Sequence, residues 1–397
     1  MLTGHGGNVH FWASVLGCLP QDIVDMSSNV NPLGPMEGLV DFLRDRMDVI
    51  SALPQADASD VVRRFGERYG IDSGRVLIGN GTTHFIYALP DVLDTKRALV
   101  FGPTYSDYAD AFIQHGAAVV HRIAGPDDGF RHRLEELSDD ERDCDTVVIC
   151  NPNNPTGGRI ERSVIEAFCR RHPERFVVID ESYLPFSDAE LETTLLYGDL
   201  PNVMVLHSMS KMFRIPGLRI GFAVTPNDRV RRRFHAIQQP WSVNALAQEA
   251  ARFLLDPDRP TEAFVAETRR YLNRERRRMA DELDRISELR TYPSETSFLL
   301  LRLPEGFDAA TLVEESVRTH RMLLRDCSNF VGLDERYVRI SLKTPDANRR
   351  ITRWLCDRLE TGQRGIHRAP ASPVLEPNHR VRQATLHLHT TSGRMTS

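Results

Sequence analysis

The segment Phe176-Val177-Val178-Ile179-Asp180-Glu181-Ser182-Tyr183 joins a short apolar run to a carboxylate. Such a continuous run, rich in β-branched residues, is typical of a strand buried on both faces of a parallel sheet, with Asp180 at its carboxyl end. Similar runs at 146–149 and 203–206 are also followed by polar side chains, and helical segments separate them. The alternation of strands and helices predicts an α/β domain.

Working outward from this segment, apolar runs of the same kind recur over the first 224 residues. They lie at 76–78, 98–101, 118–120, 146–149, 176–179, 203–206 and 220–224. We therefore expect a mostly parallel, seven-stranded sheet in a large domain of residues 36–270. A long charged helix is predicted over 262–286, and shorter strand and helix patterns follow at 297–301, 308–320, 337–341 and 346–359. These patterns predict a small α+β domain of residues 271–361.

The two ends of the chain are expected to behave differently. Residues 1–35 should pack on the small domain and beside the functional site. Residues 362–397 are rich in Pro, Arg, Thr and Ser and have no hydrophobic periodicity, which predicts a disordered tail.

The composition narrows the class of partner. A formal net charge of -5 does not favour binding to nucleic acid, so a small molecule is the expected partner. No run approaches the ~20 apolar residues that span a bilayer, so we expect a cytoplasmic protein without membrane contact. The six cysteines are scattered and form no CxxC pair, which predicts neither disulfides nor a metal site. They are Cys18, Cys144, Cys150, Cys169, Cys327 and Cys356.

A lysine follows the predicted strand at 203–206. Lys211 closes the sequence Ser208-Met209-Ser210-Lys211, and Arg219 follows eight residues later. Hydroxyl and guanidinium groups in this pattern can bind a phosphate beside the lysine. Taken alone, Lys211 could equally be a solvent-exposed residue after a strand.

Polar residues at the ends of the neighbouring strands can likewise be interpreted as functional or as purely structural. Asp180 is either a ligand-binding acid at the carboxyl edge of the sheet or the start of a helix. Tyr183 follows within one helical turn. Asn154 lies in a Pro- and Asn-rich turn that its local chemistry alone would explain.

Two further segments precede these residues in the chain. Gly81 and Thr82 follow the strand at 76–78, where we expect a helix to begin near His84, and glycine there allows an anion to approach backbone N–H groups. Tyr105 follows the strand at 98–101 and is either a stacking aromatic or an ordinary packed side chain.

Together these residues match what pyridoxal 5'-phosphate (PLP) requires. The cofactor needs a lysine for a Schiff base, an acid beside the pyridine nitrogen, donors to the ring hydroxyl, an aromatic stacking surface and a phosphate site. The sequence offers one candidate for each, in order, at the ends of successive strands. Coincidence does not explain the whole set.

The same order of motifs resembles the fold type I PLP enzymes of the class I/II aminotransferase family. The resemblance covers His5 to about Leu359 and is strongest to the branch that contains histidinol-phosphate aminotransferase and the threonine-phosphate decarboxylase of cobalamin biosynthesis. It implies an aspartate-aminotransferase-like fold and a homodimer. It further implies catalytic roles for Lys211, Asp180 and Tyr183, cofactor contacts from Gly81, Thr82, Tyr105, Asn154, Ser208, Ser210 and Arg219, and substrate contacts from His5, Asn31, Asn154, Arg325 and Arg339.

Several segments are more similar to the decarboxylase. They are His5-Gly6-Gly7-Asn8, Ser28-Asn29-Val30-Asn31-Pro32-Leu33-Gly34, Gln239-Pro240-Trp241-Ser242-Val243-Asn244-Ala245-Leu246-Ala247 and Arg325-Asp326-Cys327-Ser328-Asn329-Phe330. The resemblance implies that Arg339 binds the substrate α-carboxylate and that His5 and Arg325 contact a distal phosphate. His5 could instead cap a turn. One position departs from the pattern, because Leu53 stands where relatives carry a Tyr that reaches the partner subunit's cofactor.

Three functions follow from this resemblance. The first is decarboxylation of L-threonine O-3-phosphate to aminopropanol phosphate. The second is transamination of histidinol phosphate or of another phosphorylated or phosphonate amine. The third is a PLP-binding regulator without catalysis, which would require a winged helix before the fold; we do not expect one, because the resemblance begins at His5.

Overall fold

The computed structural model describes residues 6–135 and 137–363. A seven-stranded sheet forms the centre of the large part, in the order β2-β8-β7-β6-β5-β3-β4. The strands are β2 (Val76–Gly79), β3 (Arg97–Gly102), β4 (Ala118–Ile123), β5 (Thr146–Cys150), β6 (Phe176–Asp180), β7 (Val203–Ser208) and β8 (Gly221–Val224). Only β8 runs against its neighbours in this sheet. The prediction of a mostly parallel seven-stranded sheet is confirmed.

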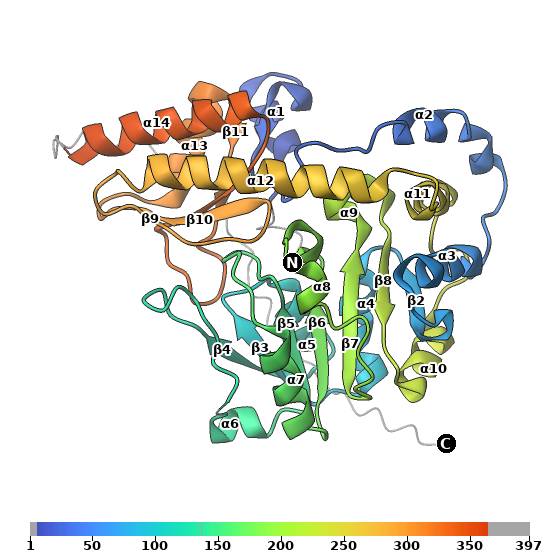
Figure 1. Cartoon of the computed structure of the whole chain (residues 1–397). Coiled ribbons are helices and arrows are strands. Elements are labelled where there is room, and N and C mark those ends of the chain that lie inside the picture. The colour runs from blue at the N-terminus through green and yellow to red at the C-terminus, as the bar shows by residue number, and fades with distance from the viewer. Residues whose placement is uncertain (1–5, 136, 364–397) are drawn as a thin grey trace, which may run out of the picture.

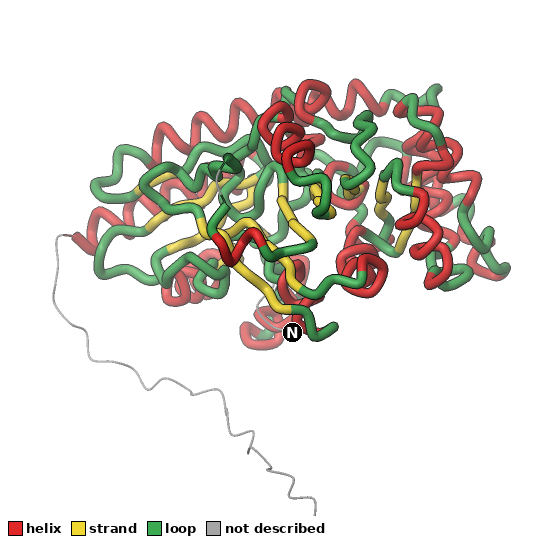
Figure 2. Tube along the Cα trace, turned by 90° about the horizontal axis from the view of Figure 1, so that it is seen from below, coloured by secondary structure: helices red, strands yellow, loops and turns green. Residues whose placement is uncertain are grey.

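The central strands are apolar because both faces of the sheet are covered. Val147, Val177 and Ile179 are fully buried, and burying each such side chain stabilises the fold by about 1.5–3 kcal/mol. Seen from below, helices lie around the strands (Figure 2). The helices of this part are α3 (Ser59–Tyr69), α4 (Thr82–Leu93), α5 (Asp107–Gln114), α6 (Asp139–Arg142), α7 (Arg162–Arg171), α8 (Glu190–Thr193), α9 (Met209–Met212), α10 (Asp228–Ile237) and α11 (Ala245–Leu255).

A second, antiparallel sheet forms the small part, in the order β12-β13-β10-β9. Its strands are β9 (Arg290–Thr291), β10 (Phe298–Arg302), β12 (Arg325–Asp326) and β13 (Tyr337–Ser341), with helices α13 (Ala309–His320) and α14 (Pro345–Gln363). Helix α12 (Thr261–Leu283) passes over both parts (Figure 1). The expected boundary at 270/271 therefore lies within one continuous helix.

The N-terminal segment links the two parts. It contains α1 (Val9–Leu16), β1 (Val24–Asp25) and α2 (Leu39–Arg44). Strand β1 pairs in parallel with β11 (Met322–Leu323) of the small part. The next residues, 27–30, then line the cavity described below.

None of the helices in residues 6–135 and 137–363 combines the length and the apolar character needed to cross a membrane. The predicted tail, apart from residues 362 and 363 at the end of α14, lies outside the described residues.

Candidate active site

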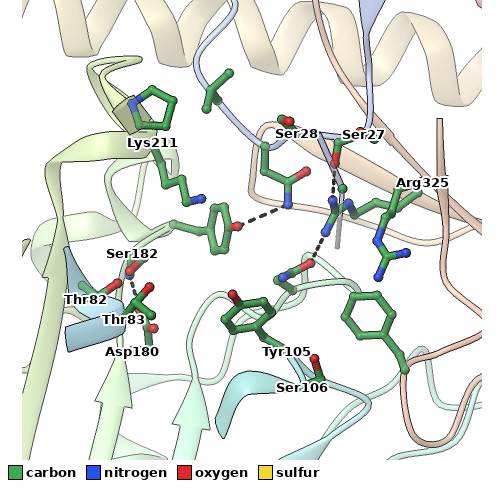
Figure 3. Close-up of a pocket in the computed structure, with 18 of the residues that line it drawn as sticks. Ser27, Ser28, Thr82, Thr83, Tyr105, Ser106, Asp180, Ser182, Lys211 and Arg325 are labelled. Carbon is green, nitrogen blue, oxygen red and sulfur yellow. Dashed lines mark hydrogen bonds between the residues drawn. The ribbon is translucent and has the colours of Figure 1, made fainter. Parts of the chain in front are cut away.

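A cavity of about 270 Å³ opens at the carboxyl ends of β5, β6 and β7, where the small sheet and the N-terminal segment meet the large sheet. This edge is where ligands bind in α/β sheets. Lys211, Asp180, Tyr105 and Arg325 project toward it from four different elements (Figure 3). Its lining comprises Gly6, Ser27, Ser28, Asn29, Val30, Thr82, Thr83, Ile86, Tyr105, Ser106, Tyr108, Asn154, Asp180, Ser182, Tyr183, Lys211, Pro216, Arg325, Asn329, Phe330 and Arg339.

Lys211 and Asp180 come from adjacent strands. Lys211 lies in α9, directly after β7, and Ser208 caps this helix by accepting a hydrogen bond from the Ser210 amide. Asp180 ends β6 and is 4% exposed. Its burial raises the pKa of the Asp180 carboxyl group, while hydrogen bonds and the charge of Lys211 lower it. The pair thus places an amine and a buried acid in one cavity.

The N-terminus of α4 forms one end of the cavity. The helix begins at Thr82, two residues before the expected start, and its N-cap Gly81 has φ +76°. This positive φ favours glycine, and a Cβ atom at Gly81 would also lie 2.8 Å from Nη2 at the flexible end of Arg219. Arg219 Nη2 in turn donates to Thr83 Oγ1 at 3.4 Å. Backbone N–H groups and a guanidinium group at this end suit a phosphate.

Gly81, Ser208, Ser210 and Arg219 are not themselves among the lining residues of the cavity. Arg219 and Gly81 lie directly behind Thr82 and Thr83, which do line it. The Ser210 hydroxyl donates to the Ile220 carbonyl oxygen at 3.4 Å.

Tyr105, Tyr183 and Asn154 surround the middle of the cavity. The Tyr105 hydroxyl donates to Asp107 Oδ2 at 2.6 Å. The Tyr183 hydroxyl accepts a hydrogen bond from Asn29 Nδ2 at 3.3 Å. Asn154 Oδ1 accepts a hydrogen bond from Nη1 of Arg339, which connects the turn after β5 to the small sheet.

Two arginines are direct neighbours in the small sheet, because Arg325 of β12 is the register partner of Arg339 of β13. Arg339 is 5% exposed; its Nη2 donates to the Ser27 carbonyl oxygen at 2.6 Å, and its buried Nε has no partner among the described residues. Arg325 donates to the Asp326 carbonyl oxygen and to Asn329 Oδ1, at 2.5 and 2.7 Å. Burial lowers the pKa of both guanidinium groups, and the charge of Arg325 lowers that of Arg339 further.

Two residues predicted to contact the substrate, His5 and Asn31, are not among the described residues that line the cavity. His5 lies outside the described residues. Asn31 is fully buried and does not line the cavity; its Nδ2 donates to the Met212 carbonyl oxygen and to Thr268 Oγ1, both at 2.8 Å. Its neighbour Asn29 lines the cavity instead.

Sequence reasoning missed Asn29, Asn329 and Tyr108. Asn29 and Asn329 stand within motifs quoted above, but nothing local distinguishes the asparagine that faces the cavity from the one that does not. Tyr108 lies in the first turn of α5, whereas Tyr105 precedes the helix, so the spacing of the two tyrosines gave no helix-face signal.

These features define an enzyme site with a lysine, a buried acid and an anion-binding end on an α/β sheet. The family model of class I and II aminotransferases matches residues 21–355. The chain belongs to this family, so the predicted fold, the recognised family and the prediction of an enzyme are confirmed.

Two relatives and one solved structure place the chain within that family. Threonine-phosphate decarboxylase of Salmonella typhimurium is 32% identical over 352 residues, which cover 88% of this chain and 94% of the relative. Histidinol-phosphate aminotransferase of Methanocaldococcus jannaschii is 27% identical, covering 84% and 88%. The crystal structure of L-threonine-O-3-phosphate decarboxylase from Porphyromonas gingivalis has a TM-score of 0.77 at 31% identity, covering 85% of this chain and all of that one.

Proposed function

We propose that this protein is a PLP-dependent decarboxylase of an amino acid that carries a second anionic group, with L-threonine O-3-phosphate as the substrate. The donor set of the cavity fits the cofactor. Lys211 would bond to it covalently, Asp180 would accept the hydrogen of the pyridine nitrogen, and Tyr105 would stack on the ring. Asn154 and Tyr183 would bind the ring hydroxyl, and Thr82 with the residues behind it would bind the phosphate.

The proposal for the substrate rests on the adjacent side chains of Arg325 and Arg339. Like charges directly across two strands destabilise a sheet, and both guanidinium groups lose water on burial. One carboxylate can neutralise only one of them. A substrate with a carboxylate for Arg339 and a second anion for Arg325 would neutralise both, and Arg339 Nε offers one further donor.

The two anchors would also choose the reaction. When bound, the cofactor supplies an electron sink for the electron pair left at the substrate Cα. How Arg325 and Arg339 orient the substrate would decide which bond to Cα breaks. If Arg325 binds the distal anion so that the carboxylate is oriented for cleavage, CO2 would leave and a proton would replace it at Cα.

If Arg339 instead holds the carboxylate so that the Cα–H bond is oriented for cleavage, Lys211 would move that proton and the amino group would pass to the cofactor, which is transamination. Relatives of both kinds share the fold. Histidinol phosphate or another phosphorylated amine would then be the substrate.

We also propose a homodimer. Exposed apolar side chains gather in the segment that contains Leu53, Ile50 and Met47, with exposed fractions of 73, 63 and 46%. The Trp241 amide donates to the Ala56 carbonyl oxygen at 2.9 Å, so the half-exposed Trp241 adjoins this segment. Covering such an apolar surface favours association.

One incubation tests the proposed reaction. PLP-loaded protein is mixed with L-threonine O-3-phosphate, and CO2 is followed together with the glutamate formed when 2-oxoglutarate is present. CO2 without glutamate is the expected result. Glutamate without CO2 would make the protein a transaminase, and neither product would exclude this substrate.

A further inference from the structure

Tyr108 of α5 reaches the acid of the site. Its hydroxyl donates to Asp180 Oδ2 at 2.8 Å, and the Ser182 amide donates to Oδ1 of the same carboxylate, also at 2.8 Å. Tyr108 and Asp180 are 2% and 4% exposed. Each carboxylate oxygen therefore has a fixed donor, and the group is held in one orientation at the floor of the cavity.

We propose that Tyr108 is a positioning residue whose hydroxyl keeps Asp180 an oriented carboxylate, so that the shared proton stays on the nitrogen of the bound pyridine ring. This inference rests on the proposed function, because it assumes that the cavity binds PLP with Asp180 at the ring nitrogen. It adds a residue that acts on the cofactor through Asp180.

The surroundings of Asp180 explain why such a donor matters. Burial alone favours the neutral acid and raises the pKa of this carboxyl group. Burial also raises the pKa of two neighbouring acids, Cys150 to about 12 and Glu181 to about 8. The groups that lower the pKa of Asp180 are Ser182, Tyr108 and Lys211, and the two hydrogen-bond donors remain when Lys211 bonds to the cofactor.

Without the Tyr108 hydroxyl, the ionised form of Asp180 loses a charge-assisted hydrogen bond. The proton would then move toward the carboxylate, and the ring nitrogen would withdraw electrons less strongly. The nitrogen that joins Lys211 to the cofactor would become more basic as a result.

The packing of Tyr108 allows a clean removal of this hydroxyl. Its ring lies edge-on to Tyr105, with centroids 5.7 Å apart and planes at 87°. Phenylalanine would keep that ring contact while deleting only the oxygen.

The decisive measurement is a pH titration of the cofactor absorbance in Tyr108→Phe. We expect the pKa of the nitrogen joining Lys211 to the cofactor to rise by about one pH unit, with kcat reduced about tenfold and KM nearly unchanged. Tyr69→Phe is the matched control, since it removes a partly buried hydroxyl that lies 3.4 Å from His207 and away from Asp180. The control should titrate like the wild type.

A Tyr108→His variant separates positioning from packing, because an imidazole N–H can replace the lost donor. Its titration should lie between those of the wild type and Tyr108→Phe. A wild-type titration curve in Tyr108→Phe, or equal shifts in the histidine and phenylalanine variants, would overturn the inference. A wild type that binds no PLP would instead overturn the proposed function.

Discussion

The two halves of the cavity are built in opposite ways. The proposed cofactor half consists of Asp180, Lys211 and the start of α4, each at the end of a strand of the large, mostly parallel sheet or just after it. The proposed substrate half consists of Ser27, Asn29, Arg325 and Arg339, which come from opposite ends of the chain and meet through hydrogen bonds such as that from Arg339 to the Ser27 carbonyl oxygen. The sheet fixes the first half, whereas packing between distant segments fixes the second.

This difference suggests that one half supplies the cofactor chemistry and the other half selects the substrate. A cofactor half supported by one sheet can stay constant while the substrate half varies, with hydrogen bonds from Asn29 to Tyr183 and from Arg339 to Asn154 linking the two. The same cofactor chemistry can then serve both decarboxylation and transamination. Substitutions in the two halves should therefore fail in different ways.

The largest effect is expected in the cofactor half. Lys211→Ala should lower kcat by about 10³-fold or more, because the variant loses both the covalent bond to the cofactor and the group that moves protons. Its absorbance should lack the band that PLP gives in the wild type. Stability measured without PLP serves as the control, and a variant that keeps the wild-type band would contradict the role of Lys211.

In the substrate half, Arg325→Gln should lower kcat/KM for L-threonine O-3-phosphate by about 10- to 100-fold, because it removes one partner of a charge pair. The loss should be small for L-threonine, which lacks the phosphate. Kinetics with both substrates check this. Equal losses would mean that Arg325 does not bind the distal anion.

A sharper contrast compares two asparagines in one motif. Asn31→Ala should destabilise the fold by about 1–3 kcal/mol, because it leaves the buried Met212 carbonyl oxygen and Thr268 hydroxyl without their donor. Asn29→Ala should alter kinetics as well as stability, because Asn29 lines the cavity and donates to Tyr183 but also accepts a hydrogen bond from the buried Ser341 hydroxyl.

Urea unfolding and kinetics on both variants test this contrast. If Asn31→Ala changes KM without losing stability, Asn31 contacts the substrate, as the sequence predicted.

The same contrast explains what could be predicted from the sequence. Residues of the cofactor half follow strands that apolar runs reveal, so Asp180, Asn154 and Lys211 could be placed at one edge of the sheet before any coordinates. Asn29 and Asn31 share one extended segment, but their side-chain amides donate to different residues more than 150 positions away, Tyr183 and Met212. No local pattern contains that information.

A pH-dependent effect is expected at Lys343, which supports the substrate half by donating to the Ser28 carbonyl oxygen at 2.9 Å. Burial lowers the pKa of this lysine from 10.5 to about 8, while Asp25 opposes the shift. Below pH 8 both the folded and the unfolded chain bind the proton, and folding carries the cost of burying a cation. Between pH 8 and 10.5 the unfolded chain binds more protons than the folded chain, so this residue adds stability as the pH rises.

Lys343→Met should remove that contribution. From pH 7.5 to pH 10.5, the unfolding free energy of the wild type should therefore rise by up to about 3 kcal/mol relative to that of the variant. Urea unfolding at several pH values measures it, and other titrating groups cancel in the difference. Lys96→Met, which removes an exposed lysine, is the control. A flat difference for Lys343 would mean that its ammonium group is solvated in the folded protein, and the substrate half would then be more open than its hydrogen bonds indicate.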